Sequence, residues 1–482
     1  METQWQEIIA LLQRGKTQLA REKLGALRGQ IAPEEEWRLH ELYGAVFHDL
    51  ADPEGAAAAY SNAAQCDKYL RSQREHYSNY LFALHYLPGL SAEDLAQQHK
   101  FYQELYREEE CLPVRKAAPH SRLRIGFIAS DFCDSAAARF YEALVTGLDV
   151  RYASTYLYAL EDEEDSFTHR LQGGGLIYRC LAGKNLVEMA EAIRWDEIDI
   201  LVDLSGHTAG GLTLMVLAKK PAPVQLSAVG YFDTTGLAAV DGLLTDGVLD
   251  PLASDAAYFS EKLVKLPQAF CFMPNEAMQK SICPRRGKNS PLTFGSFQNA
   301  MKINTDVLAL WREILELSPG ARLIVQDTTR LPERRQAVEK RLEKAGLPME
   351  RTEVRLGTDN YLANYAEVDV MLDTFPYNGG AMTATALYMG VPVVTLRGNH
   401  HSARFGASLL TAAGYGEWIA DTPRDYVKIA LQLAADRSFL TSTQANLRTE
   451  IEHSPLCDRA AYGQAFWRAC VDLWAERGDF AL

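Results

Sequence analysis

The strongest constraint on the fold is an alternation of short β-rich runs and helix-length stretches that begins after Pro119. One series contains RLRIGFIAS, ASTYLYAL, DIDILVDLSG and PVQLSAVGYF, and a second contains LTFGSF, ARLIVQD, TEVRLG, VDVMLDTF and PVVTLRG. Strands that alternate with helices predict a mostly parallel sheet with helices on both faces. Two series predict an α/β protein with two tandem Rossmann-like lobes, over residues 119–285 and 286–482, the second ending in helices.

Residues 1–118 are predicted to be all-helical. Leu42, Val46 and Leu50 recur at helical spacing, and Asp52-Pro53 predicts the start of the next helix. The segment ELYGAVFHDLADPEGAAAAYSNAAQCDK has small and large residues at the offsets of a tetratricopeptide (TPR) helix pair. The alternative is an ordinary helical hairpin. Because one or two such units cannot bury both faces, we expect this region to pack on the lobe that follows it.

Composition excludes several classes of protein. The net charge of −14 argues against a nucleic-acid or anionic-membrane surface, since both favour basic patches. No segment approaches about 18 uninterrupted apolar residues, and the N-terminal apolar run is too short for a signal peptide. The eight cysteines form no CxxC pair, so neither a zinc site nor a disulfide framework is indicated. These features predict a cytoplasmic protein.

The most informative segment is VDVMLDTFPYNGGAMTATALYMGVPVVTL, residues 368–396. A buried strand is expected to end at Asp373, and a helix is expected to open near Ala381, after Gly379 and Gly380. Glycines before a helix let backbone N–H groups approach a phosphate, whose charge the helix dipole favours. The alternative is a loop that needs glycine only for its backbone shape.

A second segment, TFGSFQNAMKINTDVLALW, places Lys302 between a strand that ends at Phe297 and a helix that Asn304 or Thr305 would cap. A lysine in this place can neutralise a diphosphate leaving group. The alternative is a solvated surface lysine, as most lysines are.

A third cluster belongs to the first lobe. LVDLSGHTAGG ends a buried strand in a glycine-flanked loop that carries His207, and GYFDTTG does the same after the next strand. A lone histidine is more often structural than catalytic, but the carboxyl end of a strand favours a functional role. His400 and His401 would need further ligands to bind a metal, and none is indicated nearby, so no metal site is predicted.

Together these segments resemble the catalytic region of the protein O-GlcNAc transferase / SPINDLY family, glycosyltransferase family 41. The strings LRIGFIASDF, ILVDLSGHTAGG, KPAPVQLSAVGYFDTTGL, LTFGSFQNAMKI, LDTFPYNGG and ALYMGVPVVTL follow in family order over about residues 120–475. The resemblance implies a GT-B fold, a UDP-sugar donor on the second lobe and no required metal or other cofactor. It also implies Ser/Thr of a protein as acceptor, docked with help from the N-terminal helices.

The resemblance implies roles for individual residues. Lys302 matches the lysine that contacts the donor diphosphate, with Asn299 in the same loop, and Tyr361 falls where the family places a residue against the uracil. Gly379, Gly380 and the helix start match the phosphate cradle, and His207 matches the GHT element of the SPINDLY branch. His207 or Asp131 would accept the acceptor's proton, unless that proton passes to the donor phosphate.

Three departures concern the chemistry. Ser135 stands where the family has an active-site histidine, and serine is no general base at neutral pH. Ala381 and Met382 replace hydroxyl donors of the cradle, so that only Thr383 remains. Thr385 stands where the family has a carboxylate for the ribose hydroxyls, and a neutral hydroxyl binds them more weakly.

Two hypotheses follow. The chain is a protein O-glycosyltransferase that moves GlcNAc or another hexose from a UDP-sugar to Ser/Thr. Alternatively, it is a catalytically degenerate subunit that binds a substrate protein or an active paralogous glycosyltransferase, through its N-terminal helices. Retention of Lys302, His207 and the glycine pair favours the enzyme, and the three departures favour the subunit.

Overall fold

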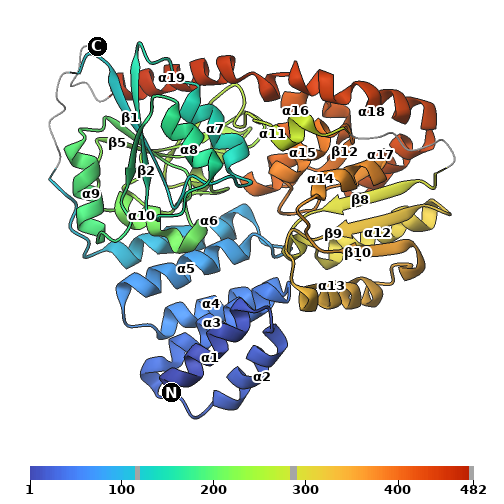
Figure 1. The fold of residues 1–482 in the computed structure, drawn as a ribbon, viewed down its shortest axis with the longest axis horizontal. Helices are drawn as coiled ribbons and strands as arrows, with labels where there is room; N and C mark the ends of the chain where they lie inside the picture. Colours follow the sequence, from blue (N-terminus) through green and yellow to red (C-terminus); the bar gives the residue numbers. More distant parts are fainter. Residues whose placement is uncertain (114–119, 283–289, 477–482) are drawn as a thin grey trace. The chain divides into compact units, whose positions relative to one another are not determined.

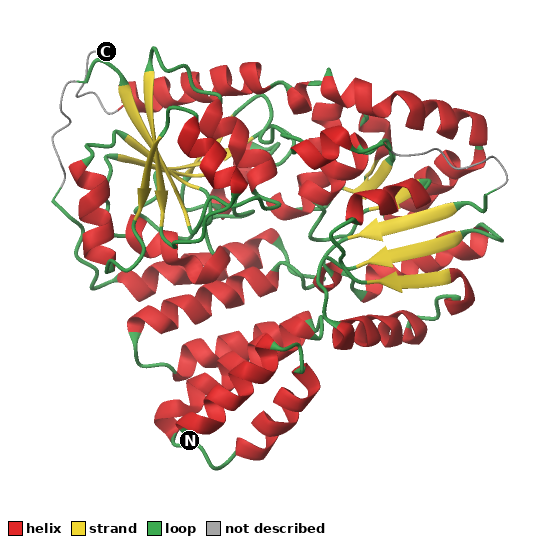
Figure 2. Ribbon diagram, viewed as in Figure 1, coloured by secondary structure: helices red, strands yellow, loops and turns green. Residues whose placement is uncertain are grey.

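The computed structural model of the chain describes residues 1–113, 120–282 and 290–476 (Figure 1). The chain forms two compact units. The first unit combines Met1–Leu90 with Pro274–Glu452, and the second unit combines Ser91–Met273 with His453–Leu482. The boundaries expected near residues 118 and 285 lie outside the described residues, so the three predicted ranges stay a prediction. Each unit contains one parallel sheet, drawn in yellow in Figure 2.

The sheet of the second unit has the strand order β3-β2-β1-β4-β5-β6-β7, and all its neighbouring strands are parallel. Its strands are β1 (Leu123–Ala129), β2 (Ala153–Ala159), β3 (Ile177–Cys180), β4 (Ile200–Asp203), β5 (Val224–Ser227), β6 (Gly242–Thr245) and β7 (Lys262–Lys265). The predicted strands of the first series correspond to β1, β2, β4 and β5. The pattern missed β3, β6 and β7, which are each four residues long.

Helices surround this sheet. They are α6 (Ala92–Phe101), η2 (Tyr102–Tyr106), α7 (Ala138–Thr146), α8 (Ser166–Gly173), α9 (Leu186–Trp195), η3 (Thr208–Gly211), α10 (Leu212–Leu217), η4 (Ala253–Tyr258), η10 (Pro455–Cys457) and α19 (Arg459–Glu476). Apolar side chains of β1, β4 and β5 form the core with those of α7 and α19. Because helices cover both faces of the sheet, the central strands β1, β4 and β5 are buried almost throughout.

The sheet of the first unit has the order β10-β9-β8-β11-β12-β13 and is also parallel. Its strands are β8 (Thr293–Phe297), β9 (Arg322–Gln326), β10 (Thr352–Arg355), β11 (Val370–Leu372), β12 (Val393–Leu396) and β13 (Ile419–Ala420). The five strands of the second predicted series are confirmed. The pattern missed β13, because it has only two residues.

The helices associated with this sheet are α11 (Glu276–Lys280), η5 (Ala300–Lys302), α12 (Thr305–Leu317), α13 (Pro332–Lys344), η6 (Met349–Arg351), α14 (Tyr361–Asn364), η7 (Tyr365–Glu367), α15 (Ala381–Tyr388), η8 (His401–Arg404), α16 (Phe405–Ala413), η9 (Gly416–Trp418), α17 (Pro423–Ala435) and α18 (Arg437–Glu452). Asn304 caps α12, as predicted, by accepting hydrogen bonds of 3.0 Å from the N–H groups of Asp306 and Val307.

The N-terminal part of the first unit is helical, as predicted, with α1 (Glu2–Gln13), α2 (Thr17–Leu27), η1 (Pro33–Glu35), α3 (Glu36–Asp49), α4 (Pro53–Cys66) and α5 (Leu70–Leu84). We expected this region to pack on the lobe that follows it, but Met1–Leu90 form one compact unit with the sheet of β8 to β13. Asp52 caps α4 and Pro53 occupies its first turn, which confirms the predicted break. The helices α3 and α4 pack as a TPR-like pair, because Gly44 leaves room for the Tyr60 ring, with which a Cβ would collide.

The described helices are all too short or too polar to cross a membrane.

We predict that Gly463→Ala destabilises the second unit. Alanine in a helix interior is normally about 1 kcal/mol more favourable than glycine. Here, however, a Cβ would press on the backbone carbonyl of Gly147 at the end of α7, which cannot move as a side chain can. We expect a net loss of about 1–3 kcal/mol in the free energy of unfolding, measured by urea denaturation. Gln464→Ala, at an exposed position of α19, is the control. A Gly463→Ala variant more stable than the unchanged chain would contradict the close packing of Gly463 on Gly147.

Candidate functional site

The first unit has a topological switch point between β8 and β11. From β8 the chain continues through β9 to β10 on one side, and it then returns to β11 on the other side. The two strands are parallel neighbours, with Phe294 opposite Val370 and Gly295 opposite Met371. The loops that follow them therefore meet at one edge of the sheet, where doubly wound sheets bind ligands.

A buried carboxylate organises the loop after β11. Asp373 Oδ1 accepts hydrogen bonds from the N–H groups of Thr374 (2.9 Å) and Gly379 (2.7 Å), and Oδ2 accepts one from the Thr395 hydroxyl (2.8 Å). Burial raises the pKa of the Asp373 carboxyl to about 6, although these hydrogen bonds oppose the shift. The carboxylate thereby closes the loop of residues 374–379 on itself.

Lys302, the last residue of η5 after β8, contacts this loop. Its Nζ donates a hydrogen bond of 2.8 Å to the carbonyl oxygen of Asn378 and lies 3.6 Å from the centre of the Tyr377 ring. Burial lowers the pKa of the Lys302 amino group to about 8, and the Asp373 carboxylate opposes this shift. The amino group therefore still carries its proton at pH 7, which places a positive charge beside the glycine pair.

The start of α15 completes this edge of the sheet. Gly380 precedes the helix, and no side chain among the described residues caps it, so the first N–H groups of α15 have no side-chain acceptor. The Thr383 hydroxyl, 1% exposed, has no hydrogen-bond partner within the described chain. Positive charge on Lys302, an uncapped helix start and a buried hydroxyl together suit an oxygen-rich anion.

The two glycines differ in role. A Cβ on Gly379 would collide with Gln298 and lie 2.5 Å from the Thr383 hydroxyl and 2.9 Å from Asp373 Oδ1, so only glycine fits. The N–H group of Gly379 binds Asp373. Any phosphate contact of the cradle therefore comes from Gly380 onward.

Asn299 and Tyr361 are two further residues that were expected to contact the donor. The Oδ1 atom of Asn299 accepts a hydrogen bond of 3.0 Å from the Met301 N–H, and it also accepts one from the Arg334 guanidinium, so this side chain shapes η5. Tyr361 begins α14 and is half-buried. Their contacts to a donor stay predictions.

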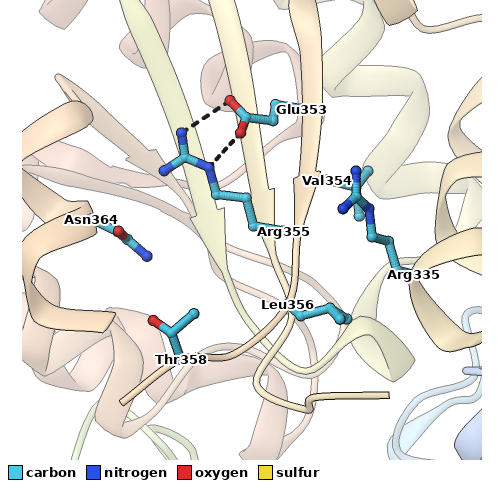
Figure 3. Close-up of a pocket in the computed structure, with 7 residues that line it drawn as sticks. All are labelled: Arg335, Glu353, Val354, Arg355, Leu356, Thr358 and Asn364. Carbon is cyan, nitrogen blue, oxygen red and sulfur yellow. Dashed lines mark hydrogen bonds and ion pairs between the residues drawn. The ribbon is translucent and has the colours of Figure 1, made fainter. Parts of the chain in front are cut away.

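A pocket of about 410 Å³ opens beside the end of β10 (Figure 3). Its lining residues come from α13, from β10 and the segment after it, and from α14: Arg335, Glu353, Val354, Arg355, Leu356, Thr358 and Asn364. The Arg355 guanidinium is held by the carboxylates of Glu353 and Glu367, at 2.8 and 3.0 Å in each case. The charge of Arg355 in the pocket wall is thus neutralised by these two carboxylates of the same chain.

The departures on α15 occupy different environments. Ala381 and Met382 are half-buried in the first turn, and neither has a hydroxyl. Thr385 is buried, at 2% exposure. The ribose contact expected of Thr385 stays a prediction.

The second unit has an equivalent switch point between β1 and β4. Asp203 at the end of β4 accepts hydrogen bonds from the N–H groups of Ser205 (3.0 Å) and Gly206 (2.9 Å), and burial raises the pKa of its carboxyl to about 6. Asp131 follows β1 and is half-buried, with Oδ1 accepting a 2.9 Å hydrogen bond from the Cys133 N–H. Ser135 is exposed, and its hydroxyl accepts a hydrogen bond from the Ala138 N–H near the start of α7.

His207 is enclosed by rings rather than exposed. Its ring centre lies 4.7 Å from that of Tyr102, 4.9 Å from Tyr231 and 5.6 Å from His99. Its Nε2 lies 2.9 Å from the Thr235 carbonyl oxygen, to which it donates, because a carbonyl can only accept. Burial, with His99 as a smaller cause, lowers the pKa of His207 well below its usual range. The imidazole is therefore neutral at pH 7.

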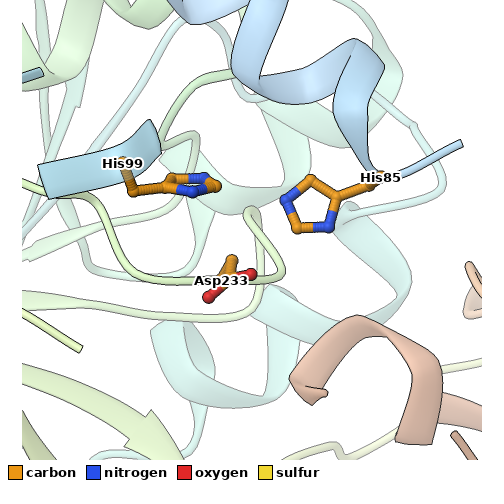
Figure 4. A group of neighbouring side chains, drawn as sticks. All are labelled: His85, His99 and Asp233. Carbon is orange, nitrogen blue, oxygen red and sulfur yellow. The ribbon is translucent and has the colours of Figure 1, made fainter. Parts of the chain in front are cut away.

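His99 is drawn in Figure 4 with Asp233 of the same unit and with His85, which belongs to the first unit. Its Nδ1 lies 2.7 Å from the Leu95 carbonyl oxygen, and its Nε2 lies 2.7 Å from the Tyr231 hydroxyl. Both nitrogens are engaged, and burial lowers the pKa of His99 to about 4. Because both ring nitrogens of His99 already have partners, we interpret His99 as a structural residue and assign it no role as a metal ligand.

Sequence reasoning did not identify Asp373 and Asn378 as part of the site. Asp373 supplies the buried acceptor of the loop, and the Asn378 carbonyl receives Lys302. The available signal was the aspartate at the end of an apolar strand, which β4 repeats with Asp203.

Comparison with known proteins gives one consistent result. The model of the family described as glycosyl transferase family 41 matches residues 100–287 and 285–466. A protein of Hordeum vulgare named "Probable UDP-N-acetylglucosamine--peptide N-acetylglucosaminyltransferase SPINDLY" is 35% identical over 412 residues, 82% of this chain and 43% of its own. The Arabidopsis thaliana protein of the same description named SEC is 27% identical over 379 residues, 75% of this chain and 38% of its own.

A solved structure also matches. A mutant O-GlcNAc transferase from Thermobaculum terrenum superimposes with a TM-score of 0.87 and 28% identity, over 97% of this chain and 89% of that one. The chain therefore spans less than half the length of the curated plant relatives, but most of the length of this solved protein.

We predict opposite pH effects for two aspartates of the second unit. The pKa of Asp203 is about 6 in the folded chain and about 3.9 when unfolded. The fold therefore loses stability as this carboxyl ionises between about pH 4 and 6. The stability difference between the unchanged chain and Asp203→Asn should narrow as the pH rises from 4.5 to 6.5, in urea titrations. For exposed Asp94, hydrogen bonds from Ser91 lower the pKa below the unfolded value of about 3.9. The difference for Asp94→Asn should therefore widen as the pH rises toward about 4.5 and stay nearly constant from there to 6.5. A stability difference that widens with rising pH for Asp203→Asn would contradict a raised pKa of Asp203 in the folded chain.

Proposed function

Because the chain belongs to glycosyltransferase family 41 and has a GT-B fold, we propose that it is a protein O-glycosyltransferase that moves GlcNAc or a related hexose from a UDP-sugar to Ser/Thr. The observation that carries the proposal is the charged Lys302 amino group beside the uncapped start of α15, at the switch point of the first unit. Names of the relatives supply the donor and the acceptor class.

Donor binding follows from the chemistry of this edge. The diphosphate of a UDP-sugar is an anion with many acceptor oxygens, and the ammonium of Lys302 and the first N–H groups of α15 supply the matching donors. The Thr383 hydroxyl adds a donor that is otherwise without a partner. These groups stabilise the charge that develops on the leaving diphosphate.

The reaction requires one bond to form and one to break. The acceptor hydroxyl oxygen attacks the anomeric carbon, and the bond from that carbon to the diphosphate oxygen breaks, so that UDP leaves with the electron pair. The hydroxyl proton must pass to a base or to the donor phosphate. Positioning and leaving-group stabilisation supply most of the rate in such a displacement.

Asp131 and His207 are the predicted acceptors of that proton. Asp131 is half-buried at the end of β1, whereas His207 is fully buried and donates through Nε2 to the Thr235 carbonyl. We propose Asp131 as the proton acceptor and His207 as a support for the loop after β4. A protein acceptor or a paralogous subunit bound by the N-terminal helices, and action in the cytoplasm, stay predictions.

The second candidate is a subunit that binds without catalysing. It is favoured by Ser135, which cannot replace an imidazole as base, and by Ala381 and Met382, which carry no hydroxyl. Each lost hydroxyl donor costs about 1–3 kcal/mol of donor binding, so a weakened site is consistent with this candidate, whereas transfer of a sugar would argue against it.

We predict that the chain binds UDP and that Lys302→Met weakens this binding at least about tenfold, because a charge-assisted contact is lost. Titration calorimetry with UDP, UDP-GlcNAc and UDP-glucose measures the dissociation constants. Lys340→Met, which removes an exposed cation from α13, should leave them unchanged. Circular dichroism checks that both variants are folded.

Activity is then measured by mass spectrometry of Ser/Thr-containing peptides and proteins incubated with the UDP-sugar that binds. A hexose or N-acetylhexosamine mass increment that disappears in Lys302→Met supports the transferase. Absence of UDP binding in the unchanged chain would refute it. Donor binding without any transfer would favour the non-catalytic subunit.

A further inference from the structure

Two arginines of α13 connect the N-terminal helices with the loop that carries Lys302. Arg334 and Arg341 lie seven residues apart, which is two helical turns, so both project from one face of α13. Both belong to the first unit, as do the helices α3 and α4 and the segment η5. Each arginine donates hydrogen bonds to both structures.

Arg334 is a buried cation with one ion-pair partner and two hydrogen-bond acceptors. Its Nε lies 2.5 Å from Asp327 Oδ2, in an ion pair whose side chains are 0% and 2% exposed. One terminal nitrogen donates to the His48 carbonyl oxygen at 2.6 Å, and the other donates to Asn299 Oδ1. Removing a charge from water is costly unless such acceptors satisfy it, so the guanidinium ties its partners together.

Asp327 extends the same connection. Its Oδ1 accepts a hydrogen bond of 3.1 Å from the Ala300 N–H. The ion pair therefore holds both Asn299 and Ala300, the two residues that precede Met301 and Lys302.

Arg341 holds the other side of η5. One terminal nitrogen donates to the carbonyl oxygens of Ile303 (2.9 Å) and Ala300 (3.3 Å), and the other donates to the Ala51 carbonyl oxygen. Lys302 is thus flanked in the chain by residues whose carbonyl groups bind this guanidinium.

The remote partners are all at helix ends. His48 lies in the last turn of α3, and Ala51, with φ of 55°, lies in the turn before Asp52 caps α4. The Glu333 carboxylate accepts a 2.6 Å hydrogen bond from the Gln18 N–H in the first turn of α2. Arginines at a helix C-terminus and a glutamate at a helix N-terminus both match the helix dipole.

We propose that Arg334 and Arg341 are positioning residues that couple the α3–α4 turn to the Lys302 loop, so that a change in the N-terminal helices alters donor affinity. Neither arginine needs to touch the donor. This inference rests on the proposed donor role of Lys302. An apolar contact would suffice to hold the helices on α13, whereas shared guanidinium groups connect two distant segments by the same side chains.

The first test is Arg341→Met, which removes the hydrogen bonds to carbonyl groups without leaving a paired carboxylate behind. Two amides report on the loop: Lys302 N–H, bonded to the Asn299 carbonyl, and Ile303 N–H, bonded to the Ala300 carbonyl. Hydrogen exchange followed by mass spectrometry should show about tenfold less protection there, and UDP should bind about tenfold more weakly. Arg341→Lys, which keeps a donor, should restore part of both. Arg312→Met, an exposed arginine of α12, should change neither.

The second test acts from the helical side. Asp52→Ala removes the cap of α4 and loosens the α3–α4 turn, which should raise exchange at residues 299–303 and weaken UDP binding. Asn185→Ala removes the equivalent cap of α9 in the second unit and should do neither.

The outcomes distinguish a failure of the proposed coupling from a failure of the proposed transferase function. If Arg341→Met and Asp52→Ala are folded and leave exchange at residues 299–303 unchanged, the coupling is refuted. If exchange changes and UDP affinity does not, the coupling reaches the loop but does not control the donor, and the inference is also refuted. If the unchanged chain binds no UDP, the proposed function fails, while the exchange measurement still decides whether the arginines hold the loop.

Discussion

A buried carboxylate at the end of a parallel strand is the interaction on which the candidate site depends. Asp373 can remain in the core only if both of its oxygens are satisfied. The N–H groups of Thr374 and Gly379 donate to Oδ1, and the Thr395 hydroxyl donates to Oδ2. Binding them bends the chain into a closed loop, and the loop then presents the Asn378 carbonyl to Lys302. The position of the lysine and the start of α15 both follow from this one requirement.

The same solution occurs in the second unit. The first four strands of each sheet follow the same order, β3-β2-β1-β4 in the second unit and β10-β9-β8-β11 in the first. A buried aspartate stands at the end of the fourth strand in both: Asp203 is the last residue of β4, and Asp373 directly follows β11. Each carboxylate accepts backbone hydrogen bonds from the loop that follows it. The loops differ in what they support: one carries the glycine pair and α15, and the other carries His207 among aromatic rings. One architecture thus supports the proposed anion site in one unit and a packed aromatic cluster in the other.

Charge is used sparingly around Lys302. Its ammonium contacts only a carbonyl and an aromatic ring among the interactions described above, so it is positioned without being neutralised by a direct ion pair. The arginines nearby are treated differently, since Arg334 is paired with Asp327 and Arg341 is bound by carbonyl groups. The lysine is therefore the cation that suits a diphosphate, and the arginines support the backbone on which it stands.

The sequence alone determined the two-sheet architecture, the helical region before it and the family, because apolar runs, glycine loops and helix caps are local signals. It also predicted roles for Lys302, Gly379 and Gly380 from their neighbours along the chain, and their contacts with a donor stay predictions. It missed β3, β6, β7 and β13, since these strands have four residues or fewer and carry little pattern. The tertiary structure decided that Gly379 binds Asp373, that His207 is enclosed, and that Arg334 and Arg341 reach His48 and Ala51. Those contacts join residues up to 290 positions apart, and no local pattern encodes which distant carbonyl a side chain will meet.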